Sequence, residues 1–280
     1  MSSLETLLDR ARRAQPGCEM RFRTERSGRR IVLLAPHPDD EAIGAGGSLV
    51  LEARAGADTL VHFMTDGARG ASGQGGEGAK RRGEAAESAR VLDLAGFLIS
   101  PWQSRDLRDD LVGSARTLAD MLAALDPDEV WMPSPYEGHP THLAATLAGL
   151  RAVRELPARV RVLGYAAWDP IPAGPNVVVQ DISRSVQVKA EAIRCHVSQC
   201  TVRAFDEAIL ARNRCEALLA AHTGTAEATH VEQFLDLTEL VRRARPEHAS
   251  LSELKAWMAE RIVARFDAVH AQLGAARCGP

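Results

Sequence analysis

Apolar positions along the chain group into short runs that alternate with longer stretches of helical spacing. The run at 31–35 is continuous and partly β-branched, which is typical of a strand buried on both faces. Further strands are predicted at 59–64, 97–100, 129–132, 159–167 and 177–182. Helices are predicted between them, at 48–54, 80–94, 110–125 and 143–156. This alternation predicts the α/β class, with a Rossmann-like, mainly parallel sheet and helices on both faces.

The last third of the chain is predicted to be helical. Apolar residues keep helical spacing at 185–198, 202–221, 231–243 and 251–273, and Pro246 separates the last two stretches. A short amphipathic helix is predicted at 4–14. We therefore expect one domain over 1–245 and a helical extension over 246–280. The extension has an apolar stripe of Ile262, Phe266 and Val269, which is more typical of packing within the chain but is compatible with a homo-oligomer.

Composition excludes several classes of protein. Of the 280 residues, 45% are hydrophobic and 25% charged, and the net charge of −3 gives no nucleic-acid footprint. The chain has no apolar run of the roughly 18 residues that a membrane span needs, and its first residues lack the apolar core of a signal peptide. Five scattered cysteines without a CxxC pair predict neither a disulfide framework nor a cysteine zinc site. We expect a cytoplasmic protein.

A polar motif directly follows the first predicted strand. It reads Pro36-His37-Pro38-Asp39-Asp40-Glu41. In open α/β sheets, ligands bind just beyond the carboxyl ends of the strands. Three neighbouring acids raise one another's pKa, so a positive partner is expected, and a divalent metal ion would supply it.

A second histidine motif follows the strand at 129–132. His139 and His142 are three residues apart, as are His37 and Asp40, so each pair can converge across a turn or a first helical turn. Both loops would lie at one edge of a parallel sheet. Nitrogen and carboxylate ligands without cysteine suit zinc or another first-row divalent ion. Taken singly, the histidines could be ordinary surface residues and the aspartates helix N-terminal acids.

Two glycine-rich stretches have other interpretations. Gly44, Gly46 and Gly47 could cradle a phosphate, but the GxGxxG spacing is not met and the nearby acids would repel a nucleotide. Residues 67–78 contain six glycines in twelve residues. This stretch is either a solvated surface loop or a lid over the strand ends.

The motif at 36–41 resembles the signature of the PIG-L/LmbE-like family, zinc-dependent N-deacetylases of amino sugars. Further motifs match in order along 31–234. They are Thr65-Asp66-Gly67, Arg81 with Glu84, His139-Pro140-Thr141-His142, Lys189-Ala190-Glu191-Ala192-Ile193 with His196-Val197-Ser198-Gln199, and Glu232-Gln233-Phe234. The family usually has an aspartate where this chain has Thr141.

The resemblance implies a division of labour among these residues. It implies metal ligands at His37, Asp40 and His142, a general base at Asp39, and a histidine at His139 that stabilises the transition state or protonates the leaving amine. It also implies sugar contacts by Arg81, Asp106 and Asp66. Glu41 would orient a metal ligand. Thr141 has a hydroxyl where the family has a carboxylate. Because no proposed ligand is lost, we expect the metal site to persist with altered hydrogen bonding around it.

Elementary chemistry supports this division. A bound zinc ion lowers the pKa of water, and a neighbouring carboxylate can take the proton. The oxyanion that develops on the acetamide can be stabilised by the metal and by a protonated His139. We therefore expect a zinc-dependent deacetylase of a small N-acetylated sugar or glycoside. The alternatives are an amidase of a sugar–thiol conjugate with the same centre, and a non-catalytic carbohydrate-binding module.

Overall fold

The centre of the molecule is an eight-stranded mixed sheet. The computed structural model describes residues 19–22, 28–68, 77–172, 174, 176–220 and 227–243. The strands lie in the order β1-β4-β3-β2-β5-β6-β8-β7. Their bounds are β1 (Glu19–Phe22), β2 (Arg30–Ala35), β3 (Asp58–Phe63), β4 (Gly96–Ile99), β5 (Glu129–Pro133), β6 (Arg161–Tyr165), β7 (Val177–Asp181) and β8 (Val231–Asp236). The five strands from β4 to β6 are parallel to one another, whereas β1 and β8 are antiparallel to their neighbours.

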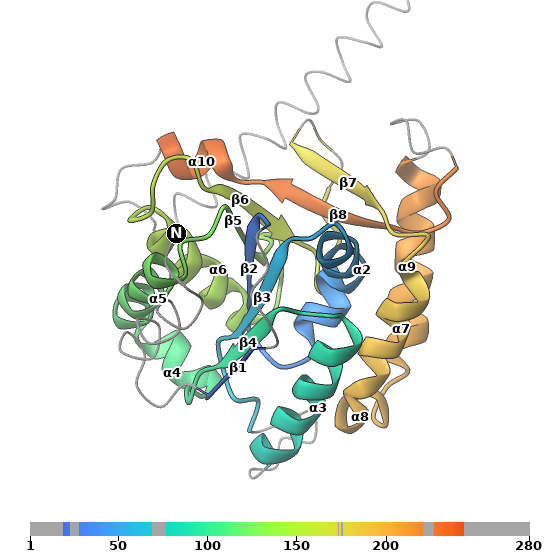
Figure 1. The fold of residues 1–280 in the computed structure, drawn as a ribbon, viewed down its shortest axis with the longest axis horizontal. Coiled ribbons are helices and arrows are strands. Elements are labelled where there is room, and N and C mark those ends of the chain that lie inside the picture. Colours follow the sequence, from blue (N-terminus) through green and yellow to red (C-terminus); the bar gives the residue numbers. More distant parts are fainter. Residues whose placement is uncertain are drawn as a thin grey trace, which may run out of the picture.

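Helices cover both faces of this sheet (Figure 1). The bounds are α2 (Asp40–Arg54), α3 (Gly78–Val91), α4 (Ser104–Asp109), α5 (Leu111–Leu125), α6 (Pro140–Val153), α7 (Val186–Cys195), α8 (Val197–Cys200), α9 (Phe205–Ala220) and α10 (Thr238–Arg243). One apolar core joins α4, α5 and α6 to the sheet, and a second joins α2, α3, α7 and α9 to the opposite face. The predicted α/β class with a mainly parallel sheet is confirmed.

The strand register brings the two histidine motifs together. Leu33 of β2 is paired with Trp131 of β5, and the two strands run in the same direction. Their carboxyl ends, and that of β3, therefore open at one edge of the sheet. The first motif joins β2 to α2, and the second joins β5 to α6.

Helix α2 begins eight residues before the predicted start. Asp40 and Glu41 lie in its first turn. Gly44, Gly46 and Gly47 are therefore inside the helix and not in a loop. A Cβ on Gly44 would lie 2.3 Å from the ring of Tyr165, and one on Gly47 would lie 2.8 Å from Ile182. The glycines thus allow the helix to approach the sheet closely, and this tertiary packing offsets their poor helix propensity.

The helix predicted over 231–243 is wrong, because its first half is strand β8. This strand is antiparallel to both β6 and β7. Glu232 and Phe234 face the α2 side of the sheet, whereas Leu235 packs on the opposite side. The alternation was hidden because Glu232 is a charged residue at an inward position. The last third of the described chain is therefore not wholly helical.

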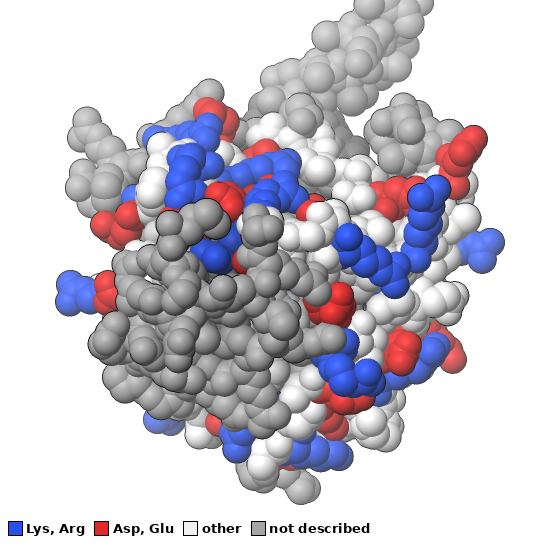
Figure 2. Space-filling model, in the orientation of Figure 1, with Lys and Arg blue, Asp and Glu red and all other residues white. Residues whose placement is uncertain are grey.

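Other expectations concern the surface and the ends. The predicted helices at 4–14 and 251–273, the extension at 246–280, and most of the loop at 67–78 lie outside the described residues. No helix in the described part is long and apolar enough to cross a bilayer. On the face drawn in Figure 2, basic and acidic side chains of the described residues are interspersed.

Candidate active site

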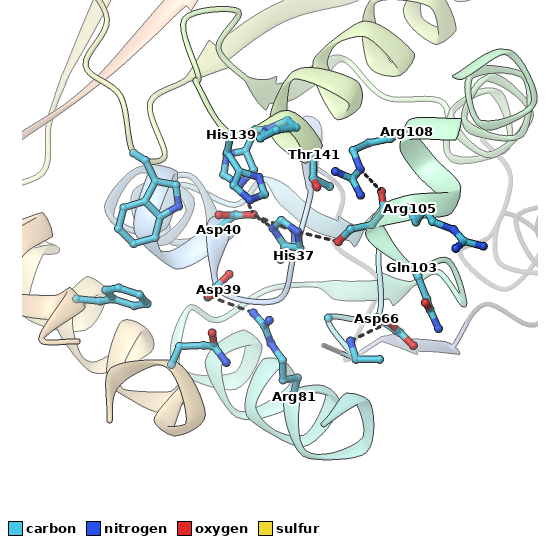
Figure 3. Close-up of a pocket in the computed structure, with 18 residues that line it drawn as sticks. His37, Asp39, Asp40, Asp66, Arg81, Gln103, Arg105, Arg108, His139 and Thr141 are labelled. Atoms are coloured by element: carbon cyan, nitrogen blue, oxygen red, sulfur yellow. Dashed lines mark hydrogen bonds and ion pairs between the residues drawn. The ribbon is translucent and has the colours of Figure 1, made fainter. Parts of the chain in front are cut away.

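A cavity of about 410 Å³ opens at the carboxyl edge of the parallel strands. Its walls come from the loops after β2, β3 and β5 and from helices on both faces (Figure 3). The lining side chains include His37, Asp39, Asp40, Asp66, Arg81, Ser104, Arg108, His139, Thr141, His142, Trp168, Gln199 and Phe205. Both predicted histidine motifs therefore face one cavity.

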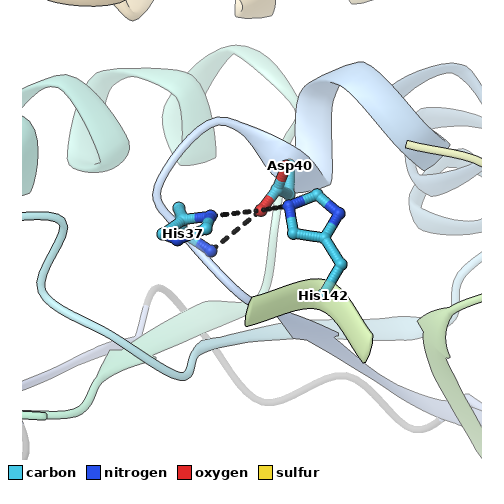
Figure 4. Close-up of side chains that lie close together, drawn as sticks. All are labelled: His37, Asp40 and His142. Atoms are coloured by element: carbon cyan, nitrogen blue, oxygen red, sulfur yellow. Dashed lines mark hydrogen bonds and ion pairs between the residues drawn. The ribbon is translucent and has the colours of Figure 1, made fainter. Parts of the chain in front are cut away.

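His37, Asp40 and His142 converge within this cavity (Figure 4). Asp40 Oδ2 lies 3.2 Å from His37 Nδ1 and 3.3 Å from His142 Nε2. Each residue offers one ligand atom within 4.8 Å of the others. Two imidazoles and one carboxylate suit a divalent first-row ion and leave coordination positions open.

The outer nitrogens of both histidines are held by other residues. Glu137 Oε2 lies 3.0 Å from His142 Nδ1, and Ser104 Oγ lies 3.1 Å from His37 Nε2. Each imidazole therefore directs its remaining nitrogen toward Asp40, and the outer hydrogen bonds are of the kind that orient metal-binding histidines. Neither Glu137 nor Ser104 was predicted to have this role. Glu137 lies in the same loop as His139, so its position in the sequence could have suggested a role near the second motif. Ser104 is the first residue of α4, a helix that was not predicted.

Asp40 and His142 shift each other's pKa at this centre. Burial lowers the pKa of His142, but Asp40 and Glu137 raise it overall to about 10. Burial raises the pKa of Asp40, but His142 and His37 hold it well below its usual range. Without a metal ion, the site is therefore a buried ion pair of protonated His142 and ionised Asp40.

Asp39 faces a different partner from its neighbour Asp40. Its Oδ2 lies 3.1 Å from the guanidinium of Arg81, which also donates to the carbonyl of Pro38. Burial raises the pKa of Asp39 to about 6, although Arg81 opposes the rise. A pKa this close to neutrality suits a general base, because at pH 7 the carboxylate is mostly ionised and can still accept a proton.

His139 lies at the cavity mouth as the residue before α6. Its ring centroid is 4.9 Å from that of His142 and 5.4 Å from that of His37. Partial burial, together with these two histidines, lowers the pKa of His139 to about 4. The lowered pKa favours the neutral imidazole, whereas the sequence led us to expect a protonated one.

The structure brings most of the remaining predicted residues to this region. Asp66 and Thr141 line the cavity. Glu41 is fully buried and bonds to the backbone N–H of Asp39, not to a proposed metal ligand. Asp106 is not among the lining residues, and its carboxylate accepts the backbone N–H of Gln103 to cap α4.

The sequence of this chain is similar to those of known deacetylases. The model of the PIG-L family, described as GlcNAc-PI de-N-acetylase, matches residues 32–153. A diacetylchitobiose deacetylase of Thermococcus kodakarensis is 34% identical over 193 residues, which is 61% of this chain and 70% of that protein.

Solved structures share the fold. A conserved protein from Thermus thermophilus superposes with a TM-score of 0.62 and 25% identity, over 74% of this chain and 93% of that chain. The N,N'-diacetylchitobiose deacetylase from Pyrococcus horikoshii gives a TM-score of 0.60 at 24% identity, over 79% of this chain and 88% of that chain. The relative that is 34% identical over 70% of its own length and the family model, whose match spans both histidine motifs, show that the chain belongs to the PIG-L family.

Proposed function

We propose that this protein is a metal-dependent N-deacetylase that removes the acetyl group from an N-acetylated amino sugar or its glycoside. The observation that carries the proposal is the convergence of His37, Asp40 and His142 beside the carboxylate of Asp39 in one cavity. The diacetylchitobiose deacetylase of Thermococcus kodakarensis, similar in sequence, supports the amino-sugar substrate.

The donor set fits zinc or another divalent first-row ion. His37, Asp40 and His142 would hold it, with Glu137 and Ser104 fixing the two imidazoles. When bound, the ion would lower the pKa of a water molecule and polarise the acetamide carbonyl. All of these residues lie within 31–234, the region in which we place the activity.

Asp39 is the proposed general base. Its carboxylate lies at the cavity wall, and Arg81 holds one of its oxygens. Asp39 would accept the proton from the attacking water and later return it to the departing amine. Because Arg81 is almost fully buried and already bonded, we assign it mainly to holding Asp39. Asp66, at the cavity wall, remains the better placed sugar contact.

His139 is proposed to stabilise the oxyanion as a neutral imidazole. Its low pKa means that it carries an N–H donor without a positive charge at pH 7. Such a donor at the cavity mouth can bond to the developing negative charge on the carbonyl oxygen. The amine proton is then best supplied by Asp39.

Two alternatives use the same cavity. An amidase of a sugar–thiol conjugate would share all of these residues, whereas a carbohydrate-binding module would not need a base beside a metal site.

The test combines metal content with product release. Zinc-loaded protein should contain about one ion per chain and should release acetate from diacetylchitobiose or from other N-acetylglucosamine glycosides. Hydrolysis of the amide that joins the sugar to the thiol-bearing acyl group, without acetate release from the glycosides, would favour the amidase. Bound metal without acetate from any substrate would favour the binding module. Almost no bound metal after zinc loading would contradict the proposed metal site.

A further inference from the structure

The main chain at Asp39 has a conformation that L-residues rarely adopt. Its φ is 136° and its ψ is −30°. The other non-glycine residues with positive φ in the described chain are Asp93 and Asp126, at 54° and 46°, which lie in the ordinary left-handed region. A backbone strained in this way persists only when surrounding contacts hold it, and such strain gathers at functional sites.

The buried side chain of Glu41 provides one such contact to the backbone of Asp39. Its Oε2 accepts the backbone N–H of Asp39 at 3.0 Å. The side chain is fully buried, so it cannot turn toward solvent. The orientation of its carboxylate therefore decides whether this bond to Asp39 is made.

Two residues from other parts of the chain hold that carboxylate. His196 Nε2 lies 2.9 Å from Glu41 Oε1, and Ser88 Oγ donates to the same oxygen at 2.6 Å. Ser88 comes from α3, and His196 lies between α7 and α8, 155 residues from Glu41. Both donors hold Oε1, which leaves Oε2 to face Asp39.

Glu41 and His196 shift each other's pKa in opposite directions. Burial raises the pKa of Glu41, but His196 and the hydrogen bonds to Glu41 lower it overall. Burial likewise lowers the pKa of His196, but Glu41 raises it overall. Removing His196 would take one hydrogen-bond partner away from the buried Glu41 carboxylate.

We propose that His196 is a positioning residue that acts through Glu41 to hold the backbone of Asp39 in its strained conformation. This inference rests on the proposed function, since it concerns the proposed base. The strained turn allows two consecutive carboxylates to face different partners. Asp39 faces Arg81, while Asp40 faces His37 and His142.

A double-mutant cycle with acetate release tests this directly. The proteins are wild type, His196→Gln, Asp39→Asn and the double variant, all loaded with zinc. His196→Gln should lower kcat about ten- to a hundredfold, with KM and metal content unchanged, because a small misplacement of a base has that cost. In the protein that carries Asp39→Asn, the same change should have almost no further effect. Equal losses in both backgrounds would overturn the inference.

A matched serine pair keeps the test valid if His196→Gln does not fold. Ser88→Ala removes a 2.6 Å bond to Glu41, and Ser198→Ala removes a 2.6 Å bond to Glu84, also between buried groups. Ser88→Ala should lower kcat severalfold at constant KM, whereas Ser198→Ala should leave kcat within about twofold. Equal losses of kcat would contradict a role through Glu41.

A structural readout separates this inference from the proposed function. If the wild-type protein releases no acetate from any substrate, the proposed function fails. Crystal structures of wild type and of His196→Gln, or of Ser88→Ala if the former does not fold, then decide the inference. Loss of the positive φ at Asp39 or of its pair with Arg81 would support it, and retention of both would overturn it.

Discussion

Glu137 Oε2 lies 3.0 Å from Nδ1 of His142, and both side chains are buried. The same carboxylate also accepts the backbone N–H groups of Ala167 and Trp168. Glu137 is therefore fixed from the loop after β6, and it orients the imidazole whose Nε2 faces Asp40. This carboxylate–histidine pair gives the proposed metal site a rigid support.

Removing this support should weaken metal binding. We expect Glu137→Gln to reduce zinc affinity about 10- to 100-fold, as is typical when the hydrogen-bond partner of a ligand is lost. Competition with a chromophoric chelator would measure the change. Asp169→Asn is a suitable control, because Asp169 accepts the N–H of Gly138 in the same loop without touching a proposed ligand. Equal affinities of wild type and Glu137→Gln would contradict this role.

Metal binding should release a proton from His142. In the metal-free protein its pKa is about 10, so the imidazole is protonated at pH 7 and the ion must displace that proton. Because His142 is charged throughout this range, affinity should rise about tenfold per pH unit between about pH 6 and 8. Calorimetry in buffers of different ionisation enthalpy would count the protons. A heat that does not vary with the buffer would show that none is released.

Asp39→Asn should separate metal binding from catalysis. The variant should keep its zinc, because Asp39 faces Arg81 and not the three proposed ligands. Its kcat for acetate release should fall by about 10²–10⁴, the usual contribution of a general base. Metal analysis and acetate release from the same sample would check both points. A kcat close to that of wild type would remove Asp39 from this role.

Two glycines in helices should respond to alanine in opposite ways. A Cβ at Gly44 would meet the buried ring of Tyr165 at 2.3 Å, so Gly44→Ala should destabilise by about 1–3 kcal/mol. A Cβ at Gly83 in α3 would have nothing within 4 Å, so Gly83→Ala should stabilise by about 0.5–1 kcal/mol. Urea unfolding would measure both. Similar changes for the two variants would contradict the close packing of α2.

Much of the site was predictable because its chemistry is local. The motif at 36–41 and the pair of His139 and His142 each follow an apolar strand, and parallel strands open at one edge of a sheet. These two facts predict that the proposed ligands lie at one edge of the sheet. The α/β class follows from the same strand–helix alternation.

What escaped prediction depends on contacts between distant segments. In the strand at 231–236, Glu232 is a charged residue that points into the protein, which hides the alternating pattern of a strand. Its burial is explained only by the ion pair with Lys189, at 2.5 Å. Glu232 also accepts the N–H groups of Gly47 and Ser48 in α2. Gly44 and Gly47 of that helix are explained only by the close contacts of Tyr165 and Ile182, which leave no room for a Cβ.

The amino-acid pattern alone thus established which residue types carry the chemistry and at which strand ends they lie. The folded chain decided how each is held: Asp39 by Glu41 and Arg81, His142 by Glu137, and Glu41 by His196. Local spacing reports the periodicity of strands and helices, which is a property of neighbouring residues. A buried polar side chain takes its role from whichever partner satisfies it, and folding brings that partner from a distant part of the chain.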